Sequence, residues 1–213
     1  MAESKRCYRQ FCGLARALDY LGERWTLLIV RDLLLAPRRY SDLLSILPVM
    51  TSNMLASRLK QMEQDGIIER ERLARPSSAL VYRLTPMGMD LEKTIDAVSQ
   101  WGERFLTTPA EDEHVDFGWV MPRLKNRYRG GYQMPIELRV DGRRYTLDLQ
   151  PETLRIRERD CIDAELIITG EFANIFELFF GPAHASEVVA RGDLVVEGKF
   201  GRWPKMLAAF GLR

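Results

Sequence analysis

The sequence has few of the residues that most often bind metals or serve as catalytic bases. It has only two histidines, His114 and His184, and neither lies near a cluster of Cys, Asp or Glu at ligand spacing. Its three cysteines are an odd number and form no CxxC pair. A metal site, a histidine-based triad and a secreted disulfide framework are therefore not expected. We predict no cofactor and, without a convergent nucleophile and base, no enzymatic activity.

Long hydrophobic runs are also missing. The longest apolar run near the start, TLLIV at residues 26–30, is far shorter than the roughly 20 residues that a membrane-spanning helix needs. The N-terminus has no basic stretch followed by an apolar segment and a small-residue cleavage site, the pattern of a signal peptide. We therefore expect a cytoplasmic protein without a membrane partner.

Charge of one sign is not in large excess, but it is unevenly distributed. The net charge is +1. Residues 1–107 carry 16 Lys/Arg and 13 Asp/Glu, whereas residues 108–213 carry 15 and 17. The first half therefore has the sign that suits contact with a polyanion, although its excess is much smaller than that of a basic tail.

Length and composition allow two small domains. The chain has 213 residues, of which 46% are hydrophobic, so a folded core is expected. Helical periodicity in the first half gives way to strand-like alternation after the polar segment TTPAEDEH, residues 107–114. We predict an α+β protein with two domains, residues 1–107 and residues 115–213.

The first domain is predicted to begin with three helices. Leucines recur at spacings of four and three over residues 14–21 and share one helical face. A second helix is expected from Trp25 to near Ala36-Pro37, because proline cannot continue it. A third is expected to begin at the cap Ser41 and to stop at Pro48.

The segment TSNMLASRLKQMEQDG, residues 51–66, predicts a fourth helix with one polar face. Thr51 is a suitable N-cap, and Gly66 is placed to end the helix in a left-handed conformation. The stripe that we expect to face inward consists of Leu55, Leu59 and Met62.

Two alternating segments, residues 67–73 and 80–84, then predict a hairpin. Short helices followed by a hairpin form a winged helix-turn-helix. In that fold, the small polar face of the fourth helix would enter a DNA major groove, which is about 12 Å wide.

Thr85-Pro86 predicts the start of one further helix, with Thr as the cap and Pro at the first helical position. Apolar residues from Met87 to Phe105 follow at spacings of three and four, which is typical of a helix that packs against another helix. We expect the partner to be a second subunit, so that the protein is a homodimer. The predicted dimer contacts are Leu14, Leu18, Leu91, Val98, Trp101 and Phe105.

The second domain is predicted to contain strands first and helices later. The alternating segments 136–140 and 145–149 flank Asp141-Gly142, a hairpin-turn signal. Thr169 is expected to cap the apolar helix EFANIFELFFG. Further strands are expected near residues 154–156, 166–168 and 193–198, and further helices near 185–190 and 203–210.

Four segments resemble the HxlR family of bacterial winged-helix transcription regulators. They are Cys12 with ARALDYLGERWTLLIVRDLL, PRRYSDLL, SNMLASRLKQMEQDGIIER and YRLTPMG, within residues 12–105. The resemblance implies a DNA-binding dimer with a long C-terminal helix in the subunit contact. We expect a repressor and a roughly palindromic double-stranded operator.

The polar face and the resemblance together predict which side chains meet DNA. We expect base or phosphate contacts from the fourth helix, and backbone contacts from the arginines before the third helix and from the hairpin tip. The alternatives are a merely solvated helix face and, for Arg58, a surface ion pair with Glu63. The predicted set is Arg38, Arg39, Thr51, Ser52, Asn53, Ala56, Ser57, Arg58, Lys60, Arg72, Arg75 and Ser77.

Cys12 occupies the position of the family's N-terminal cysteine, which serves some members as a thiol switch. Arg9 and Arg16 are close enough in sequence to favour its thiolate. The resemblance therefore implies redox sensing at Cys12. The alternative is a small residue buried in the dimer contact.

Residues 116–211 are similar to sterol-carrier-protein-like domains, through the strand series, DAELIITGEFANIFELFFG and ARGDLVVEGKFGRWPKMLAAF. Such domains enclose an apolar tunnel, so the similarity implies an apolar or amphipathic small-molecule effector. The alternative is that aromatic residues at helical spacing form an ordinary core. The residues expected to line the pocket are Phe172, Phe176, Phe179, Phe180, Trp203 and Met206.

Two functions of different classes follow from these features. We favour a regulator whose second domain binds an effector and changes the DNA affinity of the first domain, which requires unequal binding to the two states. The alternative is a carrier protein for small molecules or lipids in which DNA binding is vestigial.

Overall fold

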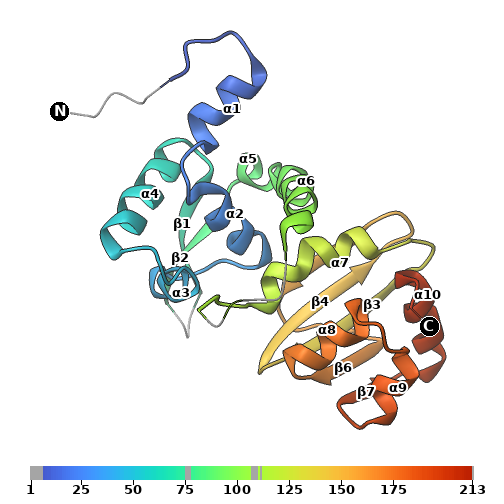
Figure 1. Cartoon of the computed structure of the whole chain (residues 1–213). Coiled ribbons are helices and arrows are strands. Elements are labelled where there is room, and N and C mark those ends of the chain that lie inside the picture. Colours follow the sequence, from blue (N-terminus) through green and yellow to red (C-terminus); the bar gives the residue numbers. More distant parts are fainter. Residues whose placement is uncertain (1–6, 75–77, 107–109, 111, 213) are drawn as a thin grey trace. The chain divides into compact units, whose positions relative to one another are not determined.

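A computed structural model describes residues 7–74, 78–106, 110 and 112–212. The chain divides into two compact units, Met1–Ile95 and Asp96–Arg213, hereafter unit 1 and unit 2 (Figure 1). The predicted domain boundary, between residues 107 and 115, falls partly on residues outside the described part of the chain and stays a prediction. In the described ranges, no helix combines the length and the apolar character needed to cross a membrane.

Unit 1 begins with four helices, as the sequence predicts. Their bounds are α1 (Gly13–Leu21), α2 (Thr26–Leu35), α3 (Tyr40–Ile46) and α4 (Ser52–Gln64). The helices enclose an apolar core to which α4 contributes Leu55, Leu59 and Met62, each at most 1% exposed. The predicted inward stripe of α4 is therefore confirmed.

The helix caps agree with the predictions at α4 and differ at α3. The Thr51 Oγ1 accepts a hydrogen bond from the Met54 N–H at 3.3 Å, and Gly66 has a φ of +73°, in the left-handed region. Ser41 was expected to cap α3, and this is wrong. Arg39 is the N-cap, and its N–H donates to the Asp42 Oδ2 at 3.0 Å, so that a carboxylate in the first turn starts the helix earlier.

The predicted hairpin consists of β1 (Ile68–Arg72) and β2 (Leu80–Leu84), which pair antiparallel. Arg38 lies between α2 and α3 and forms an isolated bridge with Tyr82 of β2, through N–H···O distances of 3.0 and 2.7 Å. This bridge attaches the hairpin to the segment that leads into α3. Residues 75–77 at the hairpin tip lie outside the described residues.

The single long helix predicted after Thr85 is wrong, although its start is correct. The Thr85 Oγ1 accepts from the Gly88 N–H at 3.1 Å, as a cap does. The chain then forms α5 (Pro86–Met89), a turn at residues 90–91, α6 (Glu92–Gly102) and the 3-10 turn η1 (Glu103–Phe105).

Close packing at Gly88 accounts for the position of the short α5. A Cβ at Gly88 would lie 2.2 Å from the Ile67 carbonyl oxygen, so the helix backbone rests directly on the chain entering β1. The Asp90 N–H closes the helix on the Pro86 carbonyl. Periodicity shows which residues share a face, but it does not show such a contact.

Unit 2 contains a five-stranded sheet in the order β5-β4-β3-β6-β7. β3 and β6 are parallel and the other neighbouring pairs are antiparallel. The predicted turn is confirmed, because Asp141 and Gly142 have φ values of +49° and +78°, which suits a tight hairpin. The strands are β3 (Met134–Val140), β4 (Arg143–Leu149), β5 (Leu154–Glu158), β6 (Leu166–Gly170) and β7 (Leu194–Gly198).

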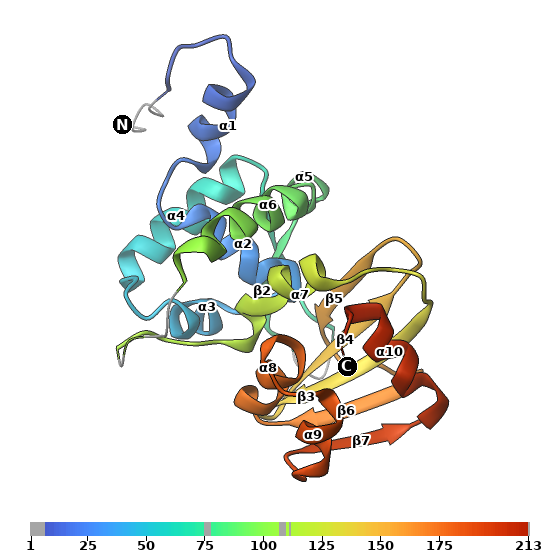
Figure 2. The same cartoon turned by 45° about the vertical axis from the view of Figure 1, so that its right-hand side comes forward.

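The sheet has one apolar and one polar face. Ile136, Leu138, Leu147 and Ile168 are fully buried on one face, and Leu138 and Leu147 have polar residues on both sides in sequence. Figures 1 and 2 show helices gathered over one side of this sheet. They are α7 (Met121–Arg127), α8 (Phe172–Phe180), α9 (Ala185–Ala190) and α10 (Trp203–Phe210), with the 3-10 turns η2 (Phe117–Val120) and η3 (Phe200–Arg202).

Two features of unit 2 differ from the sequence-based expectations. Thr169 does not cap α8: it lies in β6 opposite Arg139, and Glu171 is the N-cap. The segment η2–α7 was not predicted. Its start is marked by the Asp116 Oδ1, which accepts from the Gly118 N–H at 2.7 Å, and Pro122 stands in the first turn of α7.

Candidate DNA-binding surface

The outward face of α4 carries small polar side chains and one lysine. Ser52, Asn53, Ala56, Ser57 and Lys60 are all exposed, whereas the opposite face of the helix is buried. The helix is anchored at its start, because Thr51 caps it and the Tyr40 hydroxyl of α3 donates to the Ser52 carbonyl oxygen at 2.6 Å. The α3–α4 pair is thus tied at the turn that connects the two helices.

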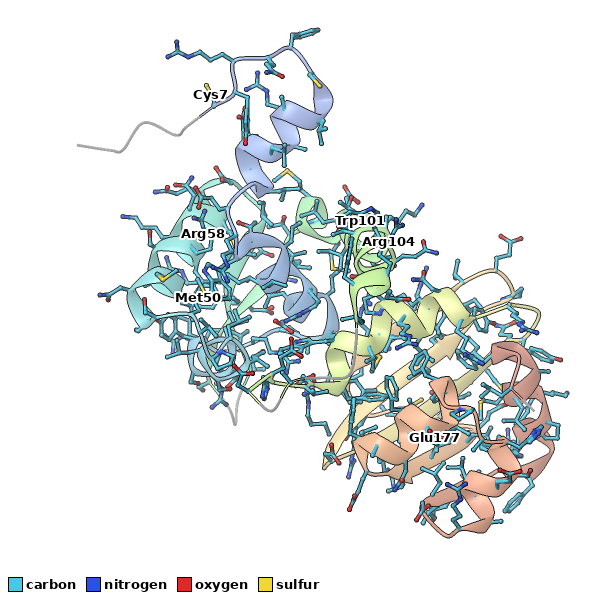
Figure 3. All side chains as sticks on the ribbon, in the orientation of Figure 1. Cys7, Met50, Arg58, Trp101, Arg104 and Glu177 are labelled. Atoms are coloured by element: carbon cyan, nitrogen blue, oxygen red, sulfur yellow. The ribbon has the colours of Figure 1, made fainter. Side chains whose placement is uncertain are left out.

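Two predicted contact residues on α4 already have partners within the chain. The Ser52 hydroxyl lies 2.8 Å from the Tyr40 hydroxyl. Arg58, which is labelled in Figure 3, forms an ion pair with Glu23 at 2.9 Å, and not with Glu63. Asn53, Ser57 and Lys60 therefore form the part of this face that has the fewest competing contacts.

The acidic residues around α4 and the hairpin are paired with arginines. Arg70 of β1 donates to both carboxylate oxygens of Glu63 at 2.8 Å, and these bonds raise the pKa of Arg70. Arg83 of β2 contacts Glu69 at 2.7 Å and Glu71 at 2.9 Å. This pairing reduces the repulsion that unpaired carboxylates on the hairpin would exert on a phosphate backbone.

The remaining predicted DNA contacts surround α4. Arg38 is held at the hairpin by its bridge to Tyr82, and Arg39 is exposed at the start of α3. Arg72 lies near the hairpin tip, where its Nη1 donates to the Ser78 carbonyl at 3.4 Å. Arg75 and Ser77 lie outside the described residues.

Most of the predicted dimer contacts are apolar and exposed. On α1, Leu14 is 70% exposed and Leu18 40%. At the end of α6 and in η1, Val98, Trp101 and Phe105 are 49–63% exposed, and Arg104 lies 5.5 Å from the Trp101 ring (Figure 3). Leu91 differs, because it lies in the turn before α6 and packs against the core of unit 1.

Cys12 is exposed at the N-cap of α1. Hydrogen bonds from the backbone of Ala15 and then of Leu14 lower the pKa of its thiol, because helix-terminal N–H groups favour the thiolate. Cys161 in unit 2 is the opposite case, since burial raises the pKa of its thiol.

The aromatic residues predicted to line a pocket divide into two groups. Phe179 and Met206 are at most 1% exposed, and Phe179 packs on Phe210 with ring centroids 5.1 Å apart, as core residues do. Phe172, Phe176, Phe180 and Trp203 are half-buried. Phe172 stacks on Phe176, and Phe176 packs against Phe180 with the two rings tilted, so the three rings form a ladder along α8.

Sequence reasoning missed two residues of this surface, Tyr40 and Arg83. Tyr40 follows Arg38-Arg39 directly, but its hydroxyl bonds become visible only once α3 and α4 are placed. Arg83 stands directly opposite Glu69 in the hairpin register, and pairing the two predicted strands would have indicated that contact.

Comparisons with known proteins place these elements among helix-turn-helix proteins. Residues 20–110 match the model of the HxlR-like helix-turn-helix family. Over 89 residues the chain is 34% identical to the HTH-type transcriptional regulator YodB of Bacillus subtilis, and this match covers 42% of the chain and 80% of YodB. The family match ends before the sheet of unit 2, so the sterol-carrier-like identity of residues 116–211 stays a prediction.

One further relative, and a solved structure of YodB, match a comparable part of the chain. An uncharacterized HTH-type transcriptional regulator of Mycobacterium tuberculosis, Rv3095, is 36% identical over 97 residues, and the match covers 46% of this chain and 61% of that protein. The solved structure of YodB in its reduced form superposes with a TM-score of 0.40 at 30% identity, covering 47% of this chain and 100% of the other.

Proposed function

The chain belongs to the HxlR-like helix-turn-helix family of transcriptional regulators, and from this premise we propose that it binds a roughly palindromic operator as a homodimer, with α4 of each subunit in a major groove. The observation that carries the proposal is the exposed face of α4, in which Asn53, Ser57 and Lys60 project from a helix whose other face is buried. Small side chains let the helix backbone approach the base edges closely.

The side chains of this face suit separate tasks in the groove. Asn53 stands in the first turn of α4, and an asparagine can form two hydrogen bonds with an adenine. Lys60 is exposed two turns further on and suits a phosphate. The arginines at residues 38, 39 and 72 would meet the backbone on either side, and the pairing of Glu69 and Glu71 with Arg83 favours that approach.

The exposed apolar side chains support the dimer in this proposal. Leu14, Trp101 and Phe105 are each more than half exposed in the single chain, and burying them against a second copy would remove apolar surface from water. A dimer with twofold symmetry would present two α4 helices, which explains why we expect inverted half-sites about one helical turn apart.

A salt titration on a duplex of random sequence tests the electrostatic part of this proposal. Wild-type affinity should fall steeply with salt, because each neutralised phosphate releases a counterion. Lys60→Glu should weaken binding about tenfold or more and reduce the slope of log affinity against log salt by roughly one per subunit. Lys205→Glu makes the same charge change at an exposed site of α10 and should bind as wild type does. Equal losses in both variants would contradict the assignment of α4.

A thiol switch at Cys12 is a second function that one observation favours. The thiol is exposed at the start of α1, and the lowered pKa increases its thiolate fraction. Because Leu14 and Leu18 belong to the same helix, a covalent change at Cys12 would alter a proposed dimer contact. Hydrogen peroxide oxidises a thiolate to a sulfenic acid and is itself reduced to water. Treating wild type and Cys12→Ser with peroxide and measuring DNA affinity tests the switch, which predicts a change in the wild type alone.

Unit 2 would provide the effector site in this proposal. Its support is the half-exposed ladder of Phe172, Phe176 and Phe180 beside a sheet with one apolar face. An effector acts on operator binding only if it binds the DNA-competent and incompetent states unequally. Operator affinity measured with and without effector tests that coupling, and equal affinities would remove it.

A further inference from the structure

Three helices of unit 2 meet at one place over the sheet. Arg123 of α7 lies over the Phe180 ring of α8, at 4.5 Å from the guanidinium carbon to the ring centroid. Phe179 of α8 packs against Phe210 of α10, and Tyr128 after α7 packs against the same ring at 5.5 Å. Figures 1 and 2 show α7, α8 and α10 on the same side of the sheet.

Three arginines converge at this junction. Arg127 donates from its Nε to the Phe210 carbonyl oxygen at 3.3 Å. The Arg129 guanidinium lies against Gly211, where a Cβ would be 2.0 Å from its Cζ. Arg123 lies one helical turn before Arg127 in α7, and Arg127 and Arg129 both contact the end of α10, so the three cations surround one junction. Burial, and then the neighbouring charges of Arg129 and Arg123, lower the pKa of Arg127.

Within the described part of the chain, these three arginines have no carboxylate partner. Lys125, the other basic residue of α7, contrasts with them, because its Nζ pairs with Asp96 at 3.3 Å. Arg143 of β4 also pairs with carboxylates, those of Asp116 and Glu158. Among the described residues, the junction is therefore a positive site without an acidic partner, in a unit that pairs many of its other charges.

Helix ends offset only part of this charge. Arg127 is the last residue of α7, and both Arg127 and Arg129 stand at the C-terminus of α10. Each helix C-terminus acts as about half a negative charge, which offsets part of the charge of Arg127 and Arg129. Arg123 stands in the first turn of α7, away from that negative end, and Arg129 is exposed to solvent. The junction therefore keeps a positive excess that is available to an anion.

The apolar side of the junction determines what kind of anion fits. Arg123 lies over both Phe176 and Phe180, and all three side chains are half-buried, so aromatic surface and cation are accessible side by side. A small hydrophilic anion would leave the aromatic rings in water. A molecule with an acidic group on an apolar body would contact both surfaces at once.

We propose that unit 2 binds a soluble amphipathic acid, whose acidic group is held by Arg123, Arg127 and Arg129 and whose apolar body lies on Phe176 and Phe180. This deepens the effector role proposed above and rests on it for its regulatory meaning, but the binding itself can be tested without DNA. Planar guanidinium groups suit a carboxylate or sulfonate, because they donate two parallel hydrogen bonds.

A matched pair of probes tests the acidic group directly in the full chain. Anilinonaphthalene sulfonate and N-phenylnaphthylamine share one aromatic body, and only the first carries an acid. We expect the sulfonate to bind at least about tenfold more tightly, the factor that one charge-assisted hydrogen bond supplies. Arg123→Gln should remove most of this preference while leaving the affinity for the uncharged probe nearly unchanged.

Three further variants and one folding control keep the test decisive. Arg155→Gln removes the same charge from an exposed position of β5 and should keep the preference. Arg123→Lys keeps the charge without the planar group and should give an intermediate result. Thermal melting followed by circular dichroism verifies that each variant is folded, and an Arg127→Gln variant tests the junction independently if Arg123→Gln unfolds.

Competition separates a soluble ligand from a membrane surface. Monomeric decanoate should displace the sulfonate probe at a concentration at least about tenfold lower than decanol requires. Equal binding of the two probes, an unchanged preference in Arg123→Gln, or sedimentation with phosphatidylglycerol vesicles without displacement by decanoate would overturn the proposal. DNA affinity is measured separately, so a protein that fails to bind DNA but shows the arginine-dependent preference would refute the regulator and leave this site standing.

Discussion

At the scale of single residues, the side chains that remain unpaired within the chain decide which charges are available to a ligand. Arg58 and Arg70 are basic residues close to the proposed DNA surface, yet each is already paired with a glutamate. Sequence patterns placed Arg58 on the correct helix but could not identify Glu23 as its partner, because the two residues come together only when α4 packs beside the start of α2. Lys60 is predicted by the same pattern and is exposed.

The contrast between two thiols gives a prediction at this scale. The pKa of Cys12 is lowered by backbone hydrogen bonds from Ala15 and Leu14, whereas burial raises the pKa of Cys161. The rate of alkylation by iodoacetamide follows the thiolate fraction, so it should reach half its maximum at a lower pH for Cys12 than for Cys161. Peptide mass spectrometry over a pH series measures both rates in one sample.

Denaturation supplies the control for the thiol experiment. In concentrated urea both environments are lost, and the two pH midpoints should converge. Equal midpoints in the folded protein would contradict the role assigned to the α1 terminus. A difference in maximal rate alone, without a shift in pH, would reflect only the greater exposure of Cys12.

At the scale of elements, the sequence predicts features that are set by residues close together in the chain. It does not predict features that are set by packing between residues far apart in the chain. The stripe of α4, its Thr51 cap and the Asp141-Gly142 turn follow from short-range periodicity and turn chemistry. The helix breaks between α5 and α6, and α5 lies in close contact with Ile67 at Gly88, a contact that no periodicity contains. The segment η2–α7 was missed although Asp116 and Pro122 mark its start, because its apolar spacing is irregular.

Gly88 provides the prediction at the element scale. An added Cβ would lie 2.2 Å from the Ile67 carbonyl oxygen and 3.1 Å from the Leu84 side chain. Gly88→Ala should therefore lower the free energy of unfolding by about 1–3 kcal/mol, the usual cost of overpacking. Gly102→Ala is the matched control in α6, where a Cβ meets nothing within 4 Å, and should be neutral or slightly stabilising. Urea denaturation compares them, and equal stabilities would contradict the packing account.

At the scale of the whole molecule, the proposed function requires two copies of a chain of 24.6 kDa. Light scattering after size exclusion should give twice that mass for the wild type. Trp101→Glu places a charge in the proposed contact and should yield the monomer mass, because an unpaired buried charge is costly. Phe200→Glu makes a similar change at a residue that is 74% exposed in unit 2, outside the proposed contact, and should remain dimeric.

A monomeric wild type would contradict the dimer, and dissociation by both variants would mean that the contact surface has been misplaced.

In unit 2, the strands could be predicted from the sequence, because their apolar residues alternate. The proposed anion site could not, because its arginines come together only where α7, α8 and α10 meet. Sequence showed which residues are basic there, but not that three of them share one location.

The most direct test of the central claim is selection of duplexes from a random DNA pool, followed by sequencing, with wild type and Asn53→Ala in parallel. The account predicts two inverted half-sites in the wild-type pool, and loss of preference at one position in each half-site for Asn53→Ala, worth about 1–3 kcal/mol per contact. A pool without an enriched motif, or the same motif from both proteins, would contradict it.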